Sequence, residues 1–162
     1  MNKKILILGI LFVAGLILVG RLPKKEEKKE VPVEVEVEGL EEIQKEVEEK
    51  TGFKIPENVT RANLSDVTRG SSRGVATKAM EEGKFKHSIL ADLPELTEKK
   101  FYEGWLVKDE DTIPTGKLSQ IKGGWYLEFS SATNYMDYDE VVVTEEEKDD
   151  KKPEKHILEG SF

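Results

Sequence analysis

The chain has 162 residues, a formal net charge of −8 and no cysteine. This length predicts one domain with additional segments, and the excess of acidic residues argues against a nucleic-acid partner. Without cysteine the chain has no disulfide, thiolate metal site, thiol nucleophile or lipid-modified cysteine, so packing must hold the fold together.

An apolar run at residues 5–20 contains no charged or polar side chain. As a helix this run reaches about 24 Å, whereas a membrane-spanning helix usually needs about 20 residues. Leu22 and the long side chains of Lys4 and Arg21 extend the span. We therefore expect residues 1–22 to form a transmembrane anchor or signal-anchor. The alternative is a cleaved signal peptide, whose basic start is also present.

The charges on the two sides of this run are nearly balanced, so the positive-inside bias is small. We place the N-terminus inside because a short N-terminal apolar run usually directs the downstream chain across the membrane. The expected location is thus the cell membrane, with a single span and an extracytoplasmic C-terminal domain.

Segment 23–70 is predicted to be a charged tether that carries one short helix. Residues 23–38 contain the runs KKEEKKE and VPVEVEVE, which favour a solvated, extended chain, although the alternating valines at 33–37 also fit a strand. Residues 40–50 have apolar side chains at helical spacing, and Gly52 follows as a stop signal. The apolar positions of this helix are Leu40, Ile43 and Val47.

Segment 71–162 shows apolar residues that alternate with polar ones, a pattern that predicts β-strands. Residues 75–79 and 85–91 alternate in this way. The dipeptide Glu82-Gly83 between them suits a tight hairpin.

Residues 101–107 are apolar on both faces, as in a strand that is covered on both sides. Residues 112–118 contain Pro114 and Gly116, which indicates an edge strand or a bend. Shorter strands are expected at 125–129, 139–144 and 156–158, with a turn at 122–124 and a charged loop at 145–155. About seven short strands predict an all-β fold, an antiparallel β-sandwich.

Six short motifs follow one another along residues 74–162: ILADLPEL, FYEGWLV, PTGKL, YLEF, VVVT with an acidic loop, and HILEG. In this order they resemble the C-terminal extracytoplasmic domain of anti-sigma-K factors. The resemblance implies a non-enzymatic β-sandwich that senses, binds or presents something. It also assigns a family-motif core to Pro94, Tyr102, Trp105, Leu106, Gly116, Val143 and Thr144.

Complete anti-sigma factors of this family carry a cytoplasmic domain that clamps the sigma factor. Residues 1–4, which precede the apolar run, are too few to build such a surface, so we expect no sigma-factor binding by this chain. The expected partner is an envelope or membrane protein, and the membrane itself is reached through the N-terminal helix.

The sequence also allows a second class of ligand. Tyr135 and Tyr138 flank Asp137 and Asp139 in an expected loop, and together these four residues form a possible ligand surface. The alternative function is therefore a carbohydrate- or cell-wall-binding β-sandwich.

We expect no cofactor, no metal and no catalysis. His87 alternates with apolar residues and is expected to be packed, whereas His156 is expected to be exposed. Acidic clusters at 109–111 and 134–140 offer oxygen ligands for calcium, but neither matches an EF-hand loop. No Gly-x-Ser-x-Gly motif or other catalytic arrangement stands out.

Overall fold

The computed structural model describes residues 33–97 and 99–162. The chain divides into two units, Met1–Glu30 and Val31–Phe162, and every described element belongs to the second. The predicted anchor at residues 1–22 lies outside the described residues. Within the described ranges, no helix is long and apolar enough to cross a bilayer.

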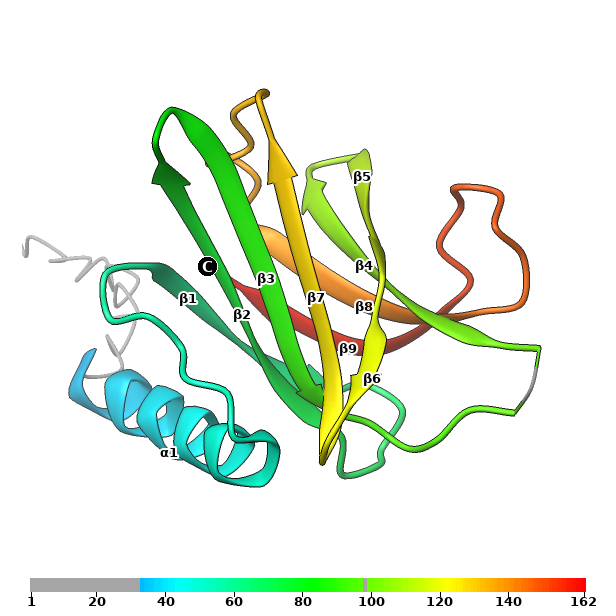
Figure 1. The fold of residues 1–162 in the computed structure, drawn as a ribbon, viewed down its shortest axis with the longest axis horizontal. Coiled ribbons are helices and arrows are strands. Elements are labelled where there is room, and N and C mark those ends of the chain that lie inside the picture. Colours follow the sequence, from blue (N-terminus) through cyan, green and yellow to red (C-terminus); the bar gives the residue numbers. More distant parts are fainter. Residues whose placement is uncertain (1–32, 98) are drawn as a thin grey trace, which may run out of the picture. The chain divides into compact units, whose positions relative to one another are not determined.

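Within the described residues, nine antiparallel strands form one sheet, with one helix beside it (Figure 1). The order of strands across the sheet is β5-β4-β8-β9-β1-β2-β3-β7-β6. The elements are α1 (Val33–Thr51), β1 (Thr60–Asp66), β2 (Arg73–Glu81), β3 (Lys84–Asp92), β4 (Phe101–Lys108), β5 (Asp111–Lys117), β6 (Ser119–Ile121), β7 (Gly124–Ser131), β8 (Glu140–Glu146) and β9 (Lys155–Ser161).

The two edge strands of this sheet, β5 and β6, are consecutive in the chain and are separated only by Leu118. The Leu118 amide donates a hydrogen bond of 2.9 Å to the carbonyl of Tyr102 on β4, and β6 then pairs with β7. One bent segment therefore leads from one edge of the sheet to the other, and the sheet is nearly closed.

The prediction of a mainly antiparallel β fold is confirmed, but the prediction of a sandwich of about seven strands is corrected to one sheet of nine strands. The reason is the contact between β9 and β1, which joins the two halves of the sheet through the pairs Ser65–Glu159 and Asp66–Leu158. A Cβ atom on Gly160 would lie 2.1 Å from the carbonyl oxygen of Asn63, so this close approach requires glycine.

The predicted hairpin at Glu82-Gly83 is confirmed. Glu81 pairs with Lys84, and the two residues between them have φ angles of 50° and 76°. Positive φ at both central positions defines a type I′ turn, whose twist matches that of the flanking strands.

The core lies inside the curled sheet, where alternate residues of the strands point toward one another. At one end, Tyr102 and Trp125 pack edge to face with ring centroids 5.0 Å apart. At the other end, Phe85, Leu106 and Tyr138 form a second cluster. The larger cluster includes Ala62, Leu64, Ala76, Ile89, Ala91, Leu127, Val141, Val143 and Leu158.

Helix α1 packs against β2 and, less extensively, against β1, β3 and β7. Val47 is buried in this contact, and ion pairs join Glu46 to Arg73 and Lys50 to Asp92. Gly52 ends the helix with a φ of 76° and donates a hydrogen bond of 2.8 Å to Glu48, as predicted for a glycine stop.

Two boundaries differ from the sequence-based expectation. The helix begins at Val33 and not near residue 40, so residues 33–38, which were expected to be extended, are helical. The sheet begins with β1 inside the predicted tether 23–70, because Ala62 and Leu64 alternate with polar residues and are buried.

Candidate functional site

Four strands, β5, β4, β8 and β9, place side chains in rows on the outer surface of the sheet. Each row takes one residue from each strand, because facing residues of paired strands lie on the same side. The first row is Thr112, Val107, Glu140 and Ser161, and the second is Pro114, Trp105, Val142 and Glu159.

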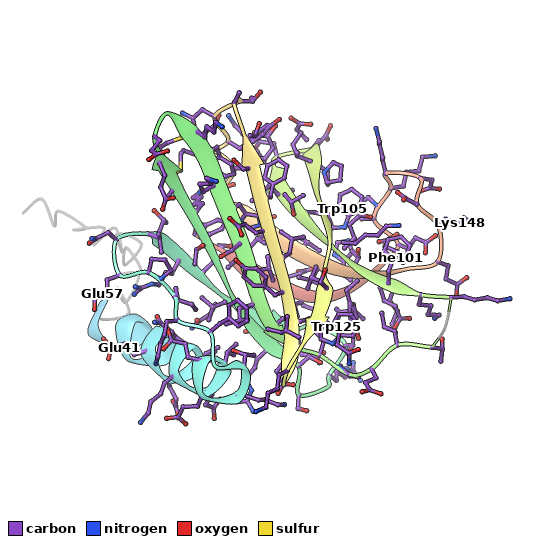
Figure 2. All side chains as sticks on the ribbon, viewed as in Figure 1. Glu41, Glu57, Phe101, Trp105, Trp125 and Lys148 are labelled. Carbon is purple, nitrogen blue, oxygen red and sulfur yellow. The ribbon has the colours of Figure 1, made fainter. Side chains whose placement is uncertain are left out.

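A pocket of about 400 Å³ opens over these two rows. Val107 and Val142 supply apolar side chains, and Pro153 from the loop between β8 and β9 contributes a wall. Figure 2 shows Trp105 and Phe101 along β4, close to the loop that carries Lys148. A concave site of this size with an apolar floor and a few polar groups is typical of ligand-binding sites.

Trp105 forms the base of this site and is fully buried. Its indole Nε1 donates a hydrogen bond of 2.8 Å to the hydroxyl of Thr144 on β8. The polar atom of the ring is therefore satisfied, and the indole is held against β8. The floor of the pocket is thus a packed and hydrogen-bonded layer.

The rim of the pocket carries two exposed carboxylates. Among the described residues Glu140 forms no ion pair, and Glu159 lies 2.6 Å from Nδ1 of His156. The neighbouring basic residues are engaged elsewhere, since Lys108 pairs with Asp137 and Lys155 lies 3.6 Å from Glu145. The rim therefore presents negative charge.

The loop 147–154 covers the adjoining part of the same outer face. The Glu154 amide donates a hydrogen bond of 2.9 Å to the buried carboxylate of Glu146, and Lys117 forms an ion pair of 2.9 Å with Asp149. Burial, with the nearby charges of Glu146 and Asp149, raises the pKa of Glu103 under this loop. These contacts fix the loop and so position the wall at Pro153.

The four residues of the sequence-predicted ligand surface all lie in the loop between β7 and β8. Tyr138 is 8% exposed, and its ring packs edge to face against that of Tyr135 with centroids 5.3 Å apart. Tyr135 also packs against Phe85 of the core, while Asp137 and Asp139 stay exposed. The tyrosine rings thus close one end of the sheet and do not form an open aromatic platform.

Lys78 holds this loop from inside the sheet. Its side chain is buried, and Nζ donates hydrogen bonds of 3.1 Å and 2.5 Å to the carbonyls of Met136 and Tyr138. The same ammonium lies 4.2 Å from the ring centroid of Phe162. In the described part of the chain, no group of three or more histidine and acidic side chains is arranged to hold a metal ion.

The structure buries five residues of the family-motif core: Tyr102, Trp105, Leu106, Val143 and Thr144. Gly116 is half-buried and has a φ of 120°, at the irregular pairing of β5 with β4. Pro94 is exposed. It lies in the connection between β3 and β4, where its carbonyl accepts a hydrogen bond of 3.3 Å from the Tyr102 hydroxyl.

Both expectations for the histidines are confirmed, since His87 is 1% exposed and His156 lies on the surface. Sequence reasoning missed the pocket itself. Its rows bring together residues from four separated strands, so no local motif marks them. The one available signal is the alternation in β8, which turns Val142 away from the core residues Val141 and Val143.

Comparison with known proteins identifies no relative: no protein-family model, no curated protein and no solved structure matches this chain. The resemblance to the outer domain of anti-sigma-K factors therefore stands as a hypothesis that rests on the order of the motifs.

Proposed function

We propose that this chain is a non-enzymatic, membrane-anchored extracytoplasmic binding module, similar in role to the outer domain of anti-sigma-K factors. Its partner is a protein of the envelope or the membrane. The observation that carries this proposal is the pocket on the outer face of β4, β8 and β9, which combines an apolar floor with a charged rim.

The side chains at the pocket favour binding over catalysis. Ser161 and His156 both line it, and His156 contacts Glu159, so the residue types of a hydrolytic triad are present. However, Ser161 lies five residues from His156 along β9, a separation of about 16 Å in an extended strand. A serine at this distance is out of reach of the imidazole as a base.

We favour a protein partner over a carbohydrate. A sugar-binding surface uses exposed aromatic faces, whereas Tyr138 is buried and Tyr135 packs on the core. The pocket over Val107 and Val142 instead offers a recess for a side chain of another protein.

Site-specific photo-crosslinking in living cells tests this function. A photoreactive residue in place of Thr112, at the pocket, is expected to give a discrete adduct with one envelope or membrane protein. The same residue in place of Lys86, on the outer side of β3, serves as the control and is expected to lack that adduct. Identical adducts from both positions, or only lipid adducts from Thr112, would contradict a binding role for the pocket.

A further inference from the structure

We infer that the pocket over Val107 and Val142 binds a lysine or arginine side chain of the partner protein. This inference rests on the proposed function, because it names the group that the binding surface receives. It follows from the shape of the pocket, from its charges and from the absence, within the described residues, of a lysine or arginine paired with Glu140 or Glu159.

The floor of the pocket suits the stem of a long basic side chain. Val107, Val142 and Pro153 provide apolar contacts in a volume of about 400 Å³. Lysine and arginine carry hydrocarbon stems that cover apolar surface while the charged head stays near water. Such a stem can lie along these apolar side chains while its head reaches the rim.

The rim supplies two carboxylates for that head. Glu140 faces Ser161 and Glu159 faces Val142 in the pairing of β8 with β9, so the two glutamates are diagonal neighbours on one face. Such diagonal neighbours lie about 7–8 Å apart, and their Cβ atoms are somewhat closer. An ammonium or guanidinium group between them can donate hydrogen bonds to both carboxylates.

The charges discriminate against other side chains. An acidic group would meet two like charges, and an apolar group would desolvate the carboxylates without pairing them. The imidazole of His156 forms a hydrogen bond with Glu159, which fixes that carboxylate at the pocket. The site thus favours a cation on a long apolar stem.

The lysines of the protein itself leave these carboxylates available. Lys148, Lys151 and Lys152 of the loop beside the pocket are exposed, and none forms an ion pair with Glu140 or Glu159 in the described structure. Within the described residues, both carboxylates are thus available to a lysine or arginine head group of the partner.

Titration of blocked pentapeptides into the full chain in detergent micelles, followed by NMR of labelled valine methyl groups, tests this inference. The peptides carry lysine, arginine, norleucine or glutamate between glycines. The lysine and arginine peptides are expected to shift Val107 and Val142 saturably, and the norleucine peptide, with the same stem but no charge, to bind at least about tenfold more weakly.

Two charge-matched variants complete the test. The double variant Glu140→Gln/Glu159→Gln is expected to lower the affinity for the lysine peptide at least about tenfold. The control Glu110→Gln/Glu147→Gln removes two exposed carboxylates outside the pocket and is expected to bind almost as the parent does. Equal binding of the lysine and norleucine peptides, equal losses in both variants, or no shift with any peptide would overturn the inference. If the Thr112 adduct persists in these cases, the pocket binds a partner through a different group.

Discussion

Replacing Trp105 with alanine is expected to lower the free energy of unfolding by about 3–5 kcal/mol, the range typical of large buried aromatic residues. The indole is fully buried and hydrogen-bonded to Thr144 of β8, and the remaining structure can fill the resulting cavity only in part. The variant also removes the base of the pocket, so binding should be lost together with stability. Equilibrium denaturation followed by circular dichroism measures the effect.

Thr144→Val separates the hydrogen bond of Trp105 from its packing. Valine keeps the shape of threonine but leaves the indole N–H without its partner at 2.8 Å, so a loss of about 1–3 kcal/mol is expected. A loss below about 1 kcal/mol for Trp105→Ala would show that the outer face of β4 is not a packed layer.

Acidification is expected to destabilise the protein through His87. The imidazole is 1% exposed, its Nδ1 lies 2.8 Å from the carbonyl of Thr77, and its Nε2 has no partner among the described residues. Burial lowers its pKa from 6.5 to about 4, and the charge of Lys78 acts in the same direction, while the hydrogen bond to Thr77 opposes both. Folded His87 therefore stays neutral where the unfolded chain takes up a proton.

The sign of the effect is set by this difference in proton uptake. Between pH 6.5 and about 4 the unfolded state binds more protons, so stability falls as the pH is lowered through this window. The loss attributable to His87 is about 3 kcal/mol. Above pH 6.5 the folded protein keeps this whole contribution to its stability. Below about pH 4 the contribution has been lost and does not decrease further.

The variant His87→Met isolates this contribution, because methionine has a similar volume and does not titrate. The difference in unfolding free energy between the parent and this variant is expected to change by about 3 kcal/mol between neutral pH and pH 4. His156→Gln, at the exposed histidine, is the control for the loss of an imidazole outside the core. A His87→Met curve parallel to that of the parent would show that His87 titrates normally.

Local patterns made several strands predictable. The alternation around residues 75–79 and 85–91, with Glu82-Gly83 between them, fixes a hairpin because its turn and its register are set within a few residues. Pro114 likewise indicated an edge strand, since it cannot donate to a sheet ladder, and β5 does lie at the edge.

Closure of the sheet could not be read from the sequence, because it depends on contacts between distant segments. From the sequence alone, Gly160 does not indicate that the carbonyl of Asn63 packs where a side chain would otherwise lie. The same holds for the pocket, where Glu140 and Glu159 become neighbours only through the register of β8 with β9. The sequence predicts Tyr135 and Tyr138 to lie at the surface because acidic residues surround them. In the structure their rings pack onto the core.

Labelling with a membrane-impermeant maleimide tests the central claim most directly, because the chain contains no cysteine of its own. Ser161→Cys, at the rim of the pocket, is predicted to react in intact cells as fully as after lysis. Asn2→Cys, on the other side of the predicted anchor, should react only after lysis. Reaction of Ser161→Cys only after lysis would place the pocket inside the cell and contradict an extracytoplasmic binding module.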